Sequence, residues 1–183
     1  MGSDARVRYT KMVIKKSFIS LLKVKSVKKI TVKEICELSE INRATFYKYY
    51  CDAYDLLDKL EQDCLNELLQ TVGSSKQHNF KDTFTLILVN LKADGELYQI
   101  LFSENGDKSF PNRIFALCYK NSAINTDKKF QKLSVAQQIW LYYFIAQGCS
   151  GILNQWISSG MVETIEEVVN FADKLFQNTI STL

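Results

Sequence analysis

The sequence predicts an all-α protein made of a small N-terminal helical head and a larger C-terminal helical body. Apolar residues recur at spacings of three and four along most of the 183 residues, which is the period of an amphipathic helix. One proline and seven glycines are too few turn residues for a sandwich or barrel of many short strands. Charge separates the two parts, because residues 1–50 hold twelve Lys or Arg against four Asp or Glu, whereas residues 51–183 hold eleven against sixteen.

The head is expected to contain three helices, of which the last two form a helix-turn-helix. The first begins within residues 4–11 and has one apolar face, made of Ile14, Phe18, Leu21 and Leu22. Thr31 with Glu34 matches the capping-box pattern at the start of a second helix. The apolar face of that helix is Val32, Ile35 and Leu38. Asn42 can cap a third helix, in which Phe46 and Tyr50 lie four residues apart and are expected to point inward.

A long helix over about residues 52–72, capped by Asp52, is expected to link the head to the body, and the domains are placed at 1–52 and 53–183. Its apolar stripe is Leu56, Leu57, Leu60, Cys64, Leu65 and Leu68. Further helices are expected at residues 80–93, 96–102, 111–119, 134–159 and 164–182, with a loop at 121–133. Gly160 supplies a stop between the last two helices, and Thr164 with Glu167 repeats the capping-box pattern.

The helix expected at residues 134–159 is apolar around much of its circumference, so we predict that it packs on two sides. Either both sides pack within one chain, or one of them meets a second copy. Gly148 and Gly151 would let another helix approach closely, which favours a homodimer. The residues expected at its interface are Gly148, Gly151, Ile152, Gln155, Phe171 and Leu175.

The reactive residue types argue against several chemistries. The five cysteines are scattered without a C-x-x-C pair and His78 is the only histidine, so neither a zinc site nor a Ser-His or Cys-His catalytic pair is expected. We therefore expect no metal, no cofactor and no enzymatic activity. No secretion leader opens the sequence, and its longest apolar run, residues 139–146, is too short to span a membrane. A cytoplasmic protein without a membrane partner is expected.

The segment ITVKEICELSEINRATFYKYYCDAYDLL, residues 30–57, resembles the DNA-binding region of the tetracycline-repressor (TetR) family of bacterial transcription regulators. The most specific part is the T-F-Y triplet of Thr45, Phe46 and Tyr47, which precedes a D-x-x-x-L-L helix start. With the first helix, this resemblance covers about a third of the chain. The G-x-x-x-x-W-I-x-x-G run over residues 151–160 is similar to the subgroup that includes regulators of dihydroxyacetone kinase genes.

The resemblance implies that the helix-turn-helix reads double-stranded DNA. The residues expected to face base edges are Arg43, Ala44 and Thr45. The residues expected to hold phosphates are Thr31, Tyr47, Lys48 and Tyr49. Two residues depart from the family pattern. Glu40 stands in the turn where many relatives have glycine, at a backbone site expected to be left-handed, and Ala53 stands where many have a phosphate-binding lysine.

The resemblance further implies a homodimeric repressor that reads a palindromic operator and is released when a small-molecule effector tilts the long linking helix. The residues expected to line the effector cavity are Phe84, Tyr98, Phe102, Tyr119, Trp140, Tyr143, Phe144 and Gln147. The alternative for most of them is an ordinary core position. Two other functions stay open. One is a coactivator that works through a protein partner, and the other is a helical small-molecule-binding protein or enzyme that keeps the head only as a scaffold.

Overall fold

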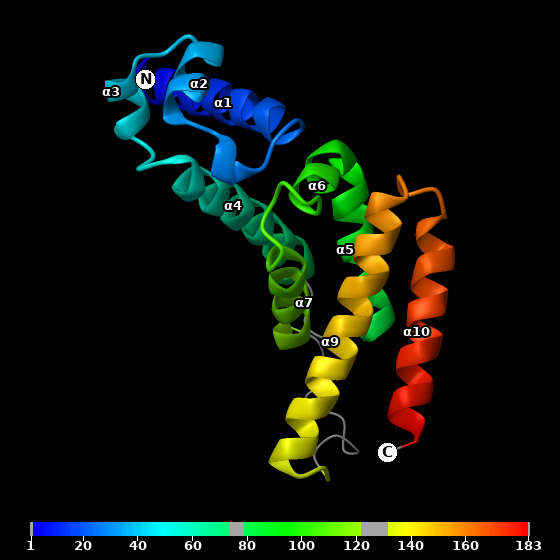
Figure 1. The fold of residues 1–183 in the computed structure, drawn as a ribbon. Coiled ribbons are helices and arrows are strands. Elements are labelled where there is room, and N and C mark those ends of the chain that lie inside the picture. Colours follow the sequence, from blue (N-terminus) through cyan, green and yellow to red (C-terminus); the bar gives the residue numbers. More distant parts are fainter. Residues whose placement is uncertain (1, 74–78, 122–131, 183) are drawn as a thin grey trace. The chain divides into compact units, whose positions relative to one another are not determined.

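The computed structural model describes residues 2–73, 79–121 and 132–182, and the side chains of residues 4–73, 79–116 and 132–182. The regular structure of these residues is entirely helical, with nine α-helices and one 3₁₀ helix and no strand (Figure 1). The all-α fold predicted from the apolar period is therefore confirmed. His78 and the expected loop at 122–131 lie outside the described residues. In the part of the chain that is described, no helix is long and apolar enough to cross a membrane.

The chain forms two compact units, which do not coincide with the expected domains. The first, here called the head unit, is Met1–Cys64 with Ile100–Lys108, and the second, the body unit, is Leu65–Gln99 with Ser109–Leu183. The division falls inside α4, Ala53–Gly73, and not in front of it. The first half of α4 belongs to the head because its apolar residues, such as Leu56 and Leu60, are buried in the same unit as α1.

The head unit consists of α1 (Gly2–Leu22), the 3₁₀ helix η1 (Val27–Lys29), α2 (Val32–Leu38), α3 (Arg43–Tyr47) and the start of α4. Its most deeply buried side chains are Ile14, Phe18, Leu22, Ile35, Phe46 and Leu56, each fully inaccessible to solvent. The expected inward face of α2 needs a correction. Leu38 is 53% exposed, because the buried face of this short helix runs through Ile35, Cys36 and the following Ser39.

A segment from the middle of the chain completes the head unit. Asn105 donates from its side-chain amide to the carbonyl of Leu22 at 3.0 Å, and its own carbonyl accepts from the N–H of Val27 at 3.3 Å. The turn that presents Asn105 requires the next residue to be glycine, since a Cβ at Gly106 would lie 2.3 Å from the carbonyl oxygen of Leu101. Residues 100–108 are therefore held on the end of α1 by two hydrogen bonds that join distant parts of the sequence.

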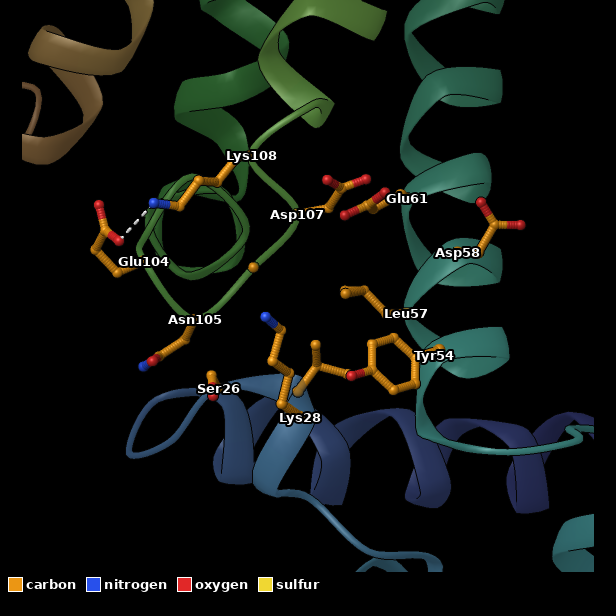
Figure 2. Close-up of a pocket in the computed structure, with 12 residues that line it drawn as sticks. Ser26, Lys28, Tyr54, Leu57, Asp58, Glu61, Glu104, Asn105, Asp107 and Lys108 are labelled. Carbon is orange, nitrogen blue, oxygen red and sulfur yellow. Dashed lines mark ion pairs between the residues drawn. The ribbon is translucent and has the colours of Figure 1, made fainter.

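The same segment borders a polar pocket of about 670 Å³ within the head unit. Figure 2 shows Asn105, Asp107 and Lys108 on one side of this pocket, Tyr54 and Glu61 of α4 on another, and the region of η1 closing a third. Four carboxylates and two lysines line it, namely Asp58, Glu61, Glu104, Asp107, Lys28 and Lys108. The ammonium group of Lys108 pairs with the carboxylate of Glu104 at 2.9 Å.

The body unit contains the second half of α4 and most of the remaining helices. These are α5 (Phe80–Ala93), α6 (Gly95–Leu101, whose last two residues belong to the head unit), α7 (Phe110–Asn121), α9 (Val135–Ser158) and α10 (Ile165–Ser181). Helix α10 packs on α5, where the ring of Phe80 stacks on that of Phe176 at 4.3 Å, and α7 packs on α9. Figure 1 shows α9 and α10 running antiparallel beside each other. Gly160, with a φ of 91°, ends α9 as predicted.

The anchor of residues 100–108 can be tested by replacing Asn105 with alanine. The change leaves the Leu22 carbonyl without its side-chain donor, and we expect it to lower the free energy of unfolding of the head unit by about 1–2 kcal/mol. Urea unfolding followed by hydrogen exchange of head amides measures this. The control is Asn112→Ala on the exposed side of α7, which we expect to be neutral. Equal protection in both variants would contradict the anchor.

Candidate nucleic-acid interface

Helix α2 begins with the predicted capping box. Thr31 Oγ accepts from the N–H of Glu34 at 3.3 Å, and the Glu34 carboxylate accepts from the N–H of Thr31 at 3.0 Å. The same carboxylate receives a hydrogen bond from Lys25, which, together with the amide and hydroxyl of Thr31, lowers the pKa of Glu34 to about 2. Thr31 is exposed, but its hydroxyl already donates to Glu34 at 2.9 Å. To donate to a phosphate, as predicted, it has to exchange one acceptor for another.

The turn between α2 and α3 contains the strained residue suspected from the sequence. Glu40 has a φ of 54°, which places a residue with a Cβ in the left-handed region. Its N–H donates to the carbonyl of Glu37, and the N–H of Ile41 donates to that of Cys36 at 3.1 Å. This pair of bonds is the helix-ending motif in which glycine normally occupies the left-handed position. The turn therefore keeps its geometry at a cost in strain.

Helix α3 is short and is fixed at its start and from below. Asn42 caps it, accepting from the N–H of Thr45 at 2.7 Å, and the Phe46 side chain is fully buried and contacts the ring of Tyr50, with 5.6 Å between ring centroids. Both features agree with the sequence-based prediction. The predicted DNA-contacting residues lie on the outside: Arg43, Ala44, Tyr47 and Lys48 are exposed, and Thr45 and Tyr49 are half-buried. These residues therefore gather on one exposed surface around α3.

Tyr49 connects this surface to α1, a contact that the sequence pattern did not indicate. The ammonium groups of Lys11 and Lys48 lie 5.6 and 5.7 Å from the centre of its ring, close enough for cation–π attraction. The Tyr49 carbonyl accepts from Lys59 Nζ at 3.0 Å. A groove of about 640 Å³ runs alongside, lined by Arg6, Val7, Thr10, Glu40, Ile41, Asn42, Thr45, Lys48 and Tyr49. The only sequence signal for the α1 residues was the basic character of the head.

The residues expected to line an effector cavity do not gather around one described pocket. Phe84 and Tyr98 are buried core residues, and Phe102 belongs to the head unit. The side chain of Tyr119 lies outside the described residues. The remaining four lie exposed on α9: Trp140, Tyr143, Phe144 and Gln147. Trp140 is 68% and Phe144 67% exposed, so in a single chain they cannot enclose a ligand. The effector site expected at these positions needs this correction for one chain.

The residues expected at a dimer interface, by contrast, lie together. A groove of about 640 Å³ between α9 and α10 is lined by five of the six, Gly148, Gly151, Ile152, Gln155 and Phe171. The sixth, Leu175, is 46% exposed, one helical turn beyond Phe171 on α10. A Cβ added at Gly148 or Gly151 would meet no atom of the chain within 4 Å. This face is open and largely apolar.

The strain at Glu40 predicts opposite effects for two similar substitutions. Glu40→Gly removes the left-handed penalty and should raise the free energy of unfolding by about 1 kcal/mol. Glu37→Gly places glycine inside α2 and should lower it by up to about 1 kcal/mol. Both changes remove one negative charge, so the comparison isolates the backbone. Thermal unfolding followed by circular dichroism measures both, and a destabilised Glu40→Gly variant would refute the strain.

The comparisons with known proteins agree on one family. A family model described as the C-terminal region of transcriptional regulators, TetR_C_8, matches residues 78–178. A TetR transcriptional regulator from Streptococcus agalactiae 2603V has a similar structure, with a TM-score of 0.70 and 22% identity over 96% of this chain and 97% of that one. The dihydroxyacetone kinase operon activator DhaS matches with a TM-score of 0.64 and 20% identity, over 95% and 97% of the two chains. A search of curated protein sequences gave no match.

The family match covers more than half of the chain and lies in the body, whereas the resemblance of the T-F-Y segment lies in the head. The two indications are thus independent in sequence. The structural likeness spans nearly the whole length of both relatives, so the fold is shared from head to body. The chain belongs to the TetR family of helix-turn-helix transcriptional regulators.

Proposed function

We propose that the protein is a homodimeric, effector-responsive repressor that binds a palindromic DNA operator through α3. The observation that carries this proposal is the exposed surface of Arg43, Ala44, Tyr47 and Lys48 on a helix fixed by a buried Phe46. Family membership supports DNA as the ligand. The excess of basic residues in positions 1–50 supports it too, because neutralising phosphates releases counterions.

The residues of this surface divide by reach. Arg43, Ala44 and Thr45 open α3 and would meet base edges when the helix enters the major groove. Tyr47, Lys48 and Tyr49 follow at its end and would hold the phosphate backbone, which fixes register without reading sequence. Thr31 would join them if its hydroxyl leaves Glu34 for a phosphate.

The α9–α10 groove supports a two-fold dimer. Spacings of three and four residues place Trp140, Phe144, Gly148, Gly151 and Gln155 on one face of α9, so the exposed aromatics continue the groove along the helix. A single chain leaves these large apolar side chains in water, and a partner helix would cover them. We therefore assign Trp140, Tyr143 and Phe144 to the dimer interface in this proposal.

Two covalent connections could carry an effector signal to the head. Helix α4 continues from the head unit into the body unit, and residues 100–108 are tied to α1 while their neighbours belong to the body. An effector that binds one conformation of the body more tightly would shift both connections and release the operator. Affinity alone would shift nothing, since the effector must discriminate between the two states. We expect the protein to act in the cytoplasm, where its operator lies.

A second candidate is transcriptional activation, which the printed name of one structural relative, an operon activator, favours. The two signs of regulation separate in a reporter assay. A repressor lowers transcription when its binding site overlaps the promoter, and deletion of its gene raises it. An activator requires its site, or its protein partner, for transcription, and deletion lowers it.

Two substitutions on α3 separate base reading from phosphate binding. Arg43→Ala should cost about 1–3 kcal/mol of binding free energy and relax the preference at one base pair per half-site. Lys48→Ala should weaken binding to all sequences alike and flatten the salt dependence by about one unit per contact. Selection from random duplexes followed by salt titration measures both, with Lys92→Ala on the exposed end of α5 as the control. Failure of the unmodified protein to retain any duplex at low salt would refute the function.

The dimer can be broken without disturbing the chain itself. Gly151→Leu adds a side chain where no atom of the chain lies within 4 Å, and it replaces a poor helix former by a good one, so the isolated helix should gain stability. The same side chain blocks close approach of a second helix. We expect sedimentation equilibrium to show a dimer for the unmodified protein and a folded monomer for Gly151→Leu, with Ile152→Glu giving the same result. Gly73→Leu, equally free of neighbours, is the control and should remain dimeric.

A further inference from the structure

The groove between α1 and the recognition helix has the chemistry of an anion site. One wall comes from α1, through Arg6, Val7 and Thr10, and the other from the α2–α3 turn and the end of α3. Figure 1 shows the N-terminal end of α1 beside α3 within the head. Arg6 is exposed, and among the described residues neither its guanidinium nor the Lys48 ammonium forms an ion pair. Two cations from different helices therefore border one groove without a protein carboxylate as partner.

The geometry of the groove selects between the possible donors. The hydroxyl of Thr10 already donates to the Arg6 carbonyl at 2.8 Å, which leaves the Arg6 side chain as the main donor from α1. Its planar guanidinium can present two parallel N–H groups to a phosphate. On the opposite wall, the Tyr49 ring lies between Lys11 and Lys48, and this contact keeps the end of α3 at a fixed place relative to α1. Glu40, exposed in the turn, is the one carboxylate on the lining.

We propose that Arg6 and Lys48 together hold one backbone phosphate of the operator in this groove, so that α1 sets the register of α3 on the DNA. The proposal rests on the proposed function, because Thr45 and Lys48 belong to both the groove and the DNA-facing surface. A phosphate held there is adjacent to the base pairs that Arg43 and Ala44 would read. Glu40 opposes the anion and limits its affinity, which favours a phosphate delivered by a duplex over a free one.

The test is a scan of the selected operator with single methylphosphonates, each of which removes one phosphate charge. For the unmodified protein we expect one position per half-site whose neutralisation lowers affinity about 10-fold. Arg6→Ala should lower affinity for the native operator by a similar factor and become insensitive to that position, and Arg6→Lys should recover part of the loss. Arg8→Ala is the matched control. It removes the same charge from an exposed site on α1 that does not line the groove, and the sensitive position should persist.

The outcomes separate this proposal from the function on which it rests. If the unmodified protein binds no duplex, both are overturned. If it binds and Arg6→Ala behaves like Arg8→Ala in affinity and in the methylphosphonate profile, only the Arg6 clamp is overturned. Glu40→Gln should raise operator affinity several-fold, because it removes the opposing charge and keeps the side-chain shape. Inorganic phosphate at millimolar concentration should not compete, and competition by phosphate alone would show a free-anion site instead.

Discussion

The burial of Phe46 is the interaction on which the DNA-facing surface depends. Helix α3 has only five residues, and a helix of that length has no stability of its own in water. Its position comes from one aromatic ring sunk fully into the head, and from Asn42, which satisfies an amide at its start. Because the inward residue is fixed, its neighbours in sequence must point outward. Arg43, Tyr47 and Lys48 are therefore presented by the packing of a side chain that touches no DNA.

Local features of this fold could be predicted from the sequence, whereas long-range ones could not. The capping boxes at Thr31 and Thr164 and the helix end at Gly160 depend on residues at most four apart, and all are present. The anchoring of residues 100–108 on α1 joins Leu22 to Asn105 across most of the head sequence, and nothing in either segment announces the other. The same holds for the groove between Arg6 and Lys48. Leu38 was misplaced for a smaller reason, since the buried face of a seven-residue helix is too narrow to include it.

The aromatic residues show why composition alone cannot locate a ligand site. Phe84 and Trp140 were both assigned to one cavity because each is a large side chain in an apolar stretch. Phe84 is buried against Phe80 in the packing of α5 on α10, whereas Trp140 lies on the outside of α9. The two-sided apolar character of α9 was predicted correctly, but it fits one face for the core and one for a partner. An apolar helix surface tells that something covers it, and the fold of a single chain decides which faces are already covered.

The interface on each head is built for modest affinity, and this links DNA binding to dimerisation. Thr31 must give up Glu34 before it can bind a phosphate, Glu40 places a negative charge beside the groove, and Ala53, which is buried, supplies no cation where many relatives have one. A weak half-site contact becomes strong only when a second head is tethered to the first, because the second contact is then intramolecular. The open face of α9 would supply that tether. A change of the distance between two weak heads is then enough to release the operator, so the weakness of each head is what makes the dimer controllable by its body.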